Sequence, residues 1–257
     1  MMQATAFEYR HRYLLHGLIY TLCLAAPWSL VMPGAWHGPV WGFVQNKSTW
    51  FLVTNMLSKP MYERFAMFWN WMLVGMILFA LAGALLRVWG AAYLGATTVQ
   101  RSNMVGDRVI ADGPFRYLRN PLYLGTILHT IAIVCLMRPE AAVLALTLIV
   151  LLQFRLIGRE EPYLMERLGG AYQAYLQEVP RLWPSTRPCT ASGMHKPNWL
   201  QGIASELYML GVALTLATVG WSRGFGWEIS IVRVMQGIII SLGVSVVARA
   251  FIPKASY

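Results

Sequence analysis

The chain has 257 residues, of which 57% are hydrophobic and only 12% are charged. Soluble globular domains carry about 25% charged residues, so this composition argues against a soluble domain and favours a protein that folds in lipid. The formal net charge of +10 comes with no nucleic-acid-binding motif. We therefore interpret the charge as a signal of membrane topology and of attraction to anionic headgroups, and predict no nucleic-acid partner.

Six apolar runs follow one another along the chain, each close to the roughly 20 residues that a helix needs to cross a bilayer. They lie at 13–32, 65–87, 121–138, 140–158, 200–220 and 229–251. The sequence thus predicts an all-α, polytopic integral membrane protein with about six transmembrane helices. Only Arg138-Pro139-Glu140 separates the third run from the fourth, which predicts a tight helical hairpin.

The first run is longer than the apolar core of a signal peptide, and no small-x-small cleavage site follows it, so we expect a retained helix. With six spans, most of the 21 Lys and Arg residues fall on the side of the N-terminus. The positive-inside rule then predicts that both termini are cytoplasmic. The lack of a separate targeting segment favours a bacterial inner membrane.

Isolated polar residues inside the apolar runs are interpreted as structural. Cys23, Cys135 and Cys189 are far apart and the five histidines do not cluster, so we predict no metal site. His129, in the third run, is interpreted as a hydrogen-bonded packing residue rather than a base. Glu206, in the fifth run, is expected to reach the interface from a helix end.

The first polar segment with a chemical pattern is GPFRYLRNPLYLG, residues 113–125. Asn120 is a good N-cap residue and Pro121 is favoured at the first helical position, so a helix is expected to begin there. Arg116 and Arg119 come just before this helix start, where free backbone N–H groups favour anions. The alternative is that the two arginines follow the positive-inside rule and reach lipid headgroups.

The second segment spans residues 159–184 and begins with Arg159, Glu160 and Glu161 directly after an apolar run. Much of it could be an amphipathic interfacial helix with tyrosine anchors. Carboxylates at a hydrocarbon boundary, however, are costly and usually have a partner. An anion site and a carboxylate pair on one membrane surface suit a ligand with a carboxylate, an ammonium and ribose hydroxyls. S-adenosylmethionine has these groups, as do other zwitterionic ligands.

Together the two segments resemble the superfamily of isoprenylcysteine carboxyl methyltransferases and phospholipid methyltransferases, which are integral membrane enzymes. The first matching stretch comprises Gly113, Pro114, Phe115, Arg116, Tyr117, Arg119, Asn120, Pro121, Tyr123 and Gly125. The second comprises Glu160, Glu161, Leu164, Leu168, Gly169, Tyr172, Tyr175, Val179, Pro180, Arg181 and Pro184. The resemblance covers about residues 80–184.

This resemblance implies a site for S-adenosylmethionine on the cytoplasmic face, in a segment at the C-terminal end of the core. The cofactor contacts that it implies, together with Arg119 from the anion site, are Gln100, Asp107, Arg108, Val109, Ile110, Phe115, Arg119, Asn120, Pro121, Leu122, Tyr123 and Glu160. The catalytic candidates are Arg155, Arg159 and Glu161.

The sequence departs from the family pattern at three positions. Asn120 replaces a histidine and cannot be cationic, and Phe115 replaces a tyrosine and lacks its hydroxyl. Leu156 stands where the prenylcysteine enzymes have an arginine associated with the substrate carboxylate. These departures argue against carboxyl methylation of a prenylated protein more than they argue against methyl transfer in general.

The leading prediction is S-adenosylmethionine-dependent methyl transfer to a hydrophobic or membrane-partitioned acceptor: a lipid amine, a carboxylate or a small thiol. An NADPH-dependent membrane sterol or enone reductase and a non-catalytic membrane scaffold remain as alternatives. We divide the chain into an N-terminal helix with a Trp-rich loop (1–64), a methyltransferase core (65–184) and a C-terminal extension with two transmembrane helices (185–257).

Overall fold

The computed structural model describes residues 3–25, 48–59, 62–95, 109–218 and 227–250, and within these ranges every regular element is helical. The predicted all-α class is therefore confirmed. The elements are α1 (Ala6–Arg10), α2 (Arg12–Ala25), α3 (Thr49–Ser58), η3 (Tyr62–Arg64), α4 (Phe65–Leu94), η4 (Gly113–Arg116), α6 (Pro121–Val134), α7 (Pro139–Leu168), α8 (Gly170–Glu178), α9 (Trp199–Ser205), α10 (Leu207–Thr218) and α11 (Trp227–Ala250).

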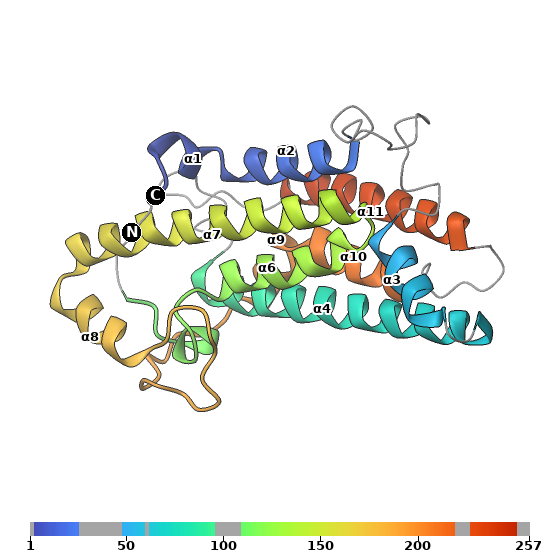
Figure 1. Cartoon of the computed structure of the whole chain (residues 1–257). Helices are drawn as coiled ribbons and strands as arrows, with labels where there is room; N and C mark the ends of the chain where they lie inside the picture. The colour runs from blue at the N-terminus through green and yellow to red at the C-terminus, as the bar shows by residue number, and fades with distance from the viewer. Residues whose placement is uncertain (1–2, 26–47, 60–61, 96–108, 219–226, 251–257) are drawn as a thin grey trace.

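Three helices, α4, α6 and α7, run along a common direction (Figure 1), and α6 packs against both of the others. The two helices α4 and α6 approach each other closely at Gly83 and Gly125. A Cβ atom on Gly83 would lie 2.6 Å from the carbonyl oxygen of Gly125, and one on Gly125 would lie 2.8 Å from the carbonyl oxygen of Gly83. Small residues of this kind let the backbones of two apolar helices touch.

The predicted hairpin is formed by α6 and α7. As expected, α6 begins at Pro121, but it ends at Val134, before the end of the apolar run. The backbone N–H groups of Thr49 and Trp50 donate to the carbonyls of Met137 and Cys135, at 2.7 and 2.8 Å. The start of α3 thus covers the hairpin turn and satisfies its carbonyl groups.

Two helices, α4 and α7, are each 30 residues long and apolar enough to cross a bilayer. A third candidate exists if α9 and α10, which are bent by 70° at their junction, count as one span. Shorter apolar helices are α6 and residues 233–248 of α11. These helices fit an integral membrane protein. The number of six spans stays a prediction, since parts of three apolar runs lie outside the described residues.

The acidic pair lies within α7, because this helix continues past the apolar run to Leu168. At its end, Gly169 adopts a φ of 56°, which glycine tolerates without strain, and the chain turns into α8. The Tyr175 hydroxyl on α8 then donates to the carbonyl of Phe115 in η4, at 2.8 Å. This hydrogen bond holds the second sequence motif, residues 159–184, against the first motif, residues 113–125.

The segment after α8 is fastened to the same region by Asp112. This carboxylate is 1% exposed and accepts hydrogen bonds from Ser192 Oγ (2.6 Å) and His195 Nδ1 (2.8 Å). Burial alone would raise the pKa of Asp112, but these hydrogen bonds hold it below the usual value. Further along, α9 and α10 pack against α4. The division into three parts stays a prediction.

Candidate functional site

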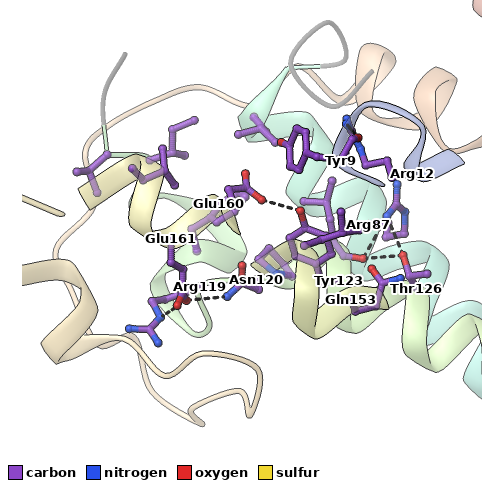
Figure 2. A pocket seen from close by; sticks show the side chains of 18 of the residues that line it. Tyr9, Arg12, Arg87, Arg119, Asn120, Tyr123, Thr126, Gln153, Glu160 and Glu161 are labelled. Carbon is purple, nitrogen blue, oxygen red and sulfur yellow. Dashed lines mark hydrogen bonds and ion pairs between the residues drawn. The ribbon is translucent and has the colours of Figure 1, made fainter. Parts of the chain in front are cut away.

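The two sequence motifs meet at one cavity of about 390 Å³ that extends along α6 and α7 (Figure 2). This volume lies within the range of small-molecule pockets, about 300–1,000 Å³. Gln153, Leu156, Glu160 and Leu164 on α7 all line it. Their spacing of three or four residues puts them on one helix face, so α7 forms a continuous wall.

We call the end of the cavity next to Glu161 its outer end. A cluster of charged side chains closes this end. Glu161, 6% exposed, lies 3.3 Å from Arg119 through Oε1 and Nε, and it is also paired with Arg181. Asn120 Nδ2 donates to Glu161 Oε1 at 3.3 Å and to the carbonyl of Arg181 at 3.1 Å. Arg119 also donates to the carbonyl of Leu176, at 2.7 Å. These contacts tie the first motif to the second.

This cluster corrects the expected role of Asn120. The residue does precede α6, but its side chain makes no capping hydrogen bond to that helix. Its amide is instead turned toward Glu161 and the backbone of Arg181, because those acceptors lie close to it in the fold. Arg116 also differs from expectation, since its Nε donates to the carbonyl of Thr190 at 2.9 Å and it does not line the cavity.

The remaining wall of the outer end is apolar and aromatic. Its members are Val109, Ile110, Phe115, Leu164, Leu168, Tyr172 and Tyr175. Phe115, Tyr172 and Tyr175 are each less than a tenth exposed. Burial raises the pKa of both tyrosines above its usual value, so their phenols remain protonated at neutral pH.

Glu160 lies beside the ion cluster but is held differently from its neighbour. Its Oε2 accepts a 2.6 Å hydrogen bond from the Tyr123 hydroxyl. Figure 2 shows this pair near the middle of the cavity, between Glu161 on one side and Arg87 on the other. Both carboxylates of the acidic pair line the cavity, but Glu161 is paired with arginines, whereas Glu160 is held by a tyrosine hydroxyl.

The inner end of the cavity is polar, and it is built by residues that the sequence did not single out. They are Tyr9, Arg12, Tyr13, His16, Arg87, Thr126 and Gln153. Two of them could have been found from the sequence, because Gln153 is a polar residue inside an apolar run and Arg87 is a charged residue at the end of one. The contribution of α1 and α2 depends on tertiary packing and carries no such local signal.

Arg87 is fixed by a buried ion pair that overturns the expectation for Glu206. Its Nε and NH2 donate to the two carboxylate oxygens of Glu206, at 2.7 and 2.8 Å, and its NH1 donates to Thr126 Oγ1 at 2.9 Å. Glu206 is 1% exposed. It does not reach the interface, because the bend between α9 and α10 turns it toward Arg87. His129 is also buried, and its ring packs edge-on against Tyr208, with centroids 6.0 Å apart.

Ten predicted site residues line this cavity: Val109, Ile110, Phe115, Arg119, Asn120, Pro121, Leu122, Tyr123, Glu160 and Glu161. Gln100, Asp107 and Arg108 lie outside the described residues.

Two catalytic candidates are not brought into the cavity. Arg155 forms a two-bond ion pair with Glu8, at 3.0 and 2.7 Å, and Arg159 NH1 donates to the carbonyl of Ala4 at 3.0 Å. In this structure both arginines hold the N-terminal segment against α7. Within the described part of the chain, no group of His, Cys, Asp and Glu could hold a metal ion.

The fold and the cavity together describe a helical membrane protein with a charged pocket among its apolar helices. Residues 70–171 match the sequence profile of the phospholipid methyltransferase family. The family lies within the isoprenylcysteine carboxyl methyltransferase-like superfamily of membrane methyltransferases, so the resemblance of the two motifs is confirmed. Comparison with curated proteins and with solved structures gives no match.

Proposed function

We propose that this protein transfers a methyl group from S-adenosylmethionine to a hydrophobic or membrane-partitioned acceptor. The observation that carries the proposal is the cavity in which both motifs meet, with Glu160 facing into it beside an aromatic and apolar wall. The family of residues 70–171 supports methyl transfer in general. The donor and the acceptor belong to the proposal.

The outer end fits the chemical groups of S-adenosylmethionine. Phe115, Tyr172 and the leucines of α7 offer aromatic and apolar surface for an adenine ring. Glu160 offers a carboxylate for an ammonium or for ribose hydroxyls. Arg119 and the N–H groups at the start of α6 offer positive partners for a carboxylate.

When bound, S-adenosylmethionine supplies an electrophilic methyl group on a positively charged sulfur. The protein then has to align the acceptor with that group and keep water away, and neither task requires a catalytic triad. Here the apolar faces of α6 and α7 exclude water, while the Tyr123 hydroxyl holds Glu160 at 2.6 Å. We assign orientation and charge stabilisation to Glu160. The cytoplasmic location of the site follows from the positive-inside prediction and remains part of the proposal.

Calorimetric titration of the full chain in detergent with S-adenosylmethionine, S-adenosylhomocysteine and NADPH tests the proposal. We expect the first two ligands to bind, and Glu160→Gln to weaken the binding of S-adenosylmethionine by at least tenfold. Glu166→Gln is the matched control, because Glu166 lies on the same helix, is exposed and does not line the cavity.

Each other outcome points to a different class of protein. If NADPH binds and S-adenosylmethionine does not, the protein would be assigned as a reductase. No binding of any of the three ligands would favour a scaffold. Equal binding by the wild type and Glu160→Gln would move the cofactor site away from Glu160.

A further inference from the structure

We infer that Glu206 is a positioning residue for the cofactor site, although its own side chain does not line the cavity. Glu206 holds Arg87 against the start of α6, and the start of α6 holds the Glu160 carboxylate. The inference rests on the proposed function, because the site that is positioned is the proposed site for S-adenosylmethionine. It gives a role in that site to the C-terminal segment, which follows the matched residues 70–171.

Arg87 joins Glu206 to the start of α6, by which we mean residues 121–126. Its Nε and NH2 donate to the two carboxylate oxygens of Glu206, at 2.7 and 2.8 Å. On the other side, its NH1 donates to the Leu122 carbonyl at 3.1 Å and to Thr126 Oγ1 at 2.9 Å. The N–H donors of a guanidinium have a fixed planar geometry. The two bonds to Glu206 therefore set the direction in which NH1 points toward α6.

The stem of Arg87 also packs on the backbone of α6. A Cβ atom on Gly125 would lie 2.6 Å from Cγ of Arg87 and 3.4 Å from its Cδ. Because Gly125 lacks this atom, the stem lies directly against the helix. Close-packed interiors transmit strain, so a change in the direction of the Arg87 side chain would displace the start of α6 or leave a gap beside it.

The start of α6 in turn lines the cavity and holds Glu160. Leu122 and Tyr123 are neighbours in the chain and both line the cavity, and the Tyr123 hydroxyl donates to Glu160 Oε2 at 2.6 Å. Figure 2 shows Arg87 bonded to Thr126 on one side of this pair. A movement at Leu122 would carry Tyr123 with it. A misplacement of about 1 Å is enough to weaken an oriented site strongly.

Glu206 has a fixed position because α9 packs closely against α4. A Cβ atom on Gly202 would lie 2.8 Å from the carbonyl oxygen of Val88, and the backbone N–H of Asn198 donates to the carbonyl of Ala92 at 2.8 Å. Glu206 comes directly after α9 and is 1% exposed. The carboxylate is thus held by residues that do not line the cavity.

The alternative is that the pair of Arg87 and Glu206 only stabilises the fold, and the variants separate the two roles. Glu206→Gln keeps the shape of the side chain and removes its charge. Arg87→Met combined with Glu206→Leu removes both charges, which often leaves stability unchanged, and also removes the bonds to α6. Glu140→Gln is the matched control, because Glu140 is paired with Arg138 at 3.5 Å and does not line the cavity.

The full chain in detergent is titrated with S-adenosylmethionine by calorimetry, and its thermal midpoint is measured in parallel. We expect the Kd to rise at least tenfold in Glu206→Gln and in the double variant, and to stay at the wild-type value in Glu140→Gln. The double variant is expected to bind weakly even though its thermal midpoint is close to that of the wild type. Wild-type affinity in the double variant would leave the pair with a stabilising role alone and overturn the inference.

Hydrogen–deuterium exchange of the same proteins without ligand tests the link to α6 separately. We expect faster exchange in Glu206→Gln to be confined to peptides covering 120–126, with peptides covering 130–137 unchanged. Unchanged exchange at 120–126, or an equal rise in both regions, would contradict positioning. If the wild type binds no S-adenosylmethionine but exchange rises only at 120–126, the proposed methyl transfer fails and the positioning of α6 by Glu206 stands.

Discussion

At the scale of single residues, the adjacent glutamates of α7 show which contacts the sequence predicts and which require the structure. The sequence predicts that Glu160 and Glu161 have partners, because carboxylates at the hydrocarbon boundary are costly. Successive residues on a helix point about 100° apart, so the two side chains meet different surroundings. Glu161 meets Arg119, while Glu160 meets Tyr123. The pairing was predictable from sequence, but the assignment of each carboxylate required the fold.

The bond between Tyr123 and Glu160 gives the first prediction. Tyr123→Phe removes a hydrogen bond to a charged group, which contributes about 1.5–3 kcal/mol. Since 1.36 kcal/mol corresponds to a factor of ten, we expect the Kd for S-adenosylmethionine to rise by about tenfold or more. Calorimetry measures this, with Tyr117→Phe as a control that does not line the cavity. An unchanged Kd in Tyr123→Phe would show that the cofactor does not use Glu160 as oriented here.

The buried pair between Arg87 and Glu206 gives the second prediction. Glu206→Ala leaves a buried guanidinium without its carboxylate, which destabilises a protein by about 3–5 kcal/mol. We expect a clear fall in the thermal unfolding midpoint in detergent. Glu140→Ala, which removes the partly exposed pair with Arg138, is expected to cost less than about 1 kcal/mol.

A double variant separates the lost charge pair from the lost packing. Arg87→Met combined with Glu206→Leu removes both charges and keeps most of the volume, and such replacements are often neutral or stabilising. We expect it to be more stable than Glu206→Ala alone. Equal stability of Glu206→Ala and the wild type would contradict the buried ion pair.

At the scale of elements, the hairpin was the most predictable part. The Asn120-Pro121 sequence predicted where α6 begins, and Arg138-Pro139-Glu140 predicted the turn before α7. The length of α7 was not predictable from hydropathy, because the helix continues through polar residues to Leu168. The contact between α4 and α6 was also missed, since glycine in an apolar run has no signal that separates a close contact from a neutral position.

Two glycines of α4 test that contact. Gly83→Ala would bring a Cβ atom to 2.6 Å from the carbonyl oxygen of Gly125, while Gly75 has nothing within 4 Å of the equivalent position. Overpacking typically costs about 1–3 kcal/mol, whereas alanine is favoured over glycine in a helix by about 1 kcal/mol. We therefore expect Gly83→Ala to lower the thermal midpoint and Gly75→Ala to keep or raise it. The opposite order would contradict the packing of α4 on α6.

The docking of α1 on α7 is expected to depend on pH. Hydrogen bonds from Arg155 lower the pKa of Glu8 from 4.5 to about 2. A carboxyl with a lowered pKa stabilises the fold fully above 4.5, and this contribution is lost as the pH falls from 4.5 toward 2. The thermal midpoint of the wild type should therefore exceed that of Glu8→Gln at pH 7, and the difference should shrink below pH 4.5. A constant difference down to pH 3 would contradict the link between Glu8 and Arg155.

At the scale of the whole molecule, the outer end of the cavity was predictable because short motifs encode it. The α6–α7 hairpin joins Phe115 and Arg119 to Glu160, and the turn at Gly169 adds Tyr172 to the same cavity. The inner end was not predictable, because it joins α1 and α2 to α4, α6 and α7, and joins Glu206 to Arg87 across 119 positions. Such pairings depend on the packing of the complete chain.

The central claim is that S-adenosylmethionine binds at the outer end of this cavity. Ultraviolet cross-linking of methyl-labelled S-adenosylmethionine to the full chain, followed by peptide mapping, tests it most directly. We expect label in peptides from 109–123 and 160–175, removed by excess S-adenosylhomocysteine. Label confined to α9 and α10, or labelling that S-adenosylhomocysteine leaves unchanged, would contradict the claim.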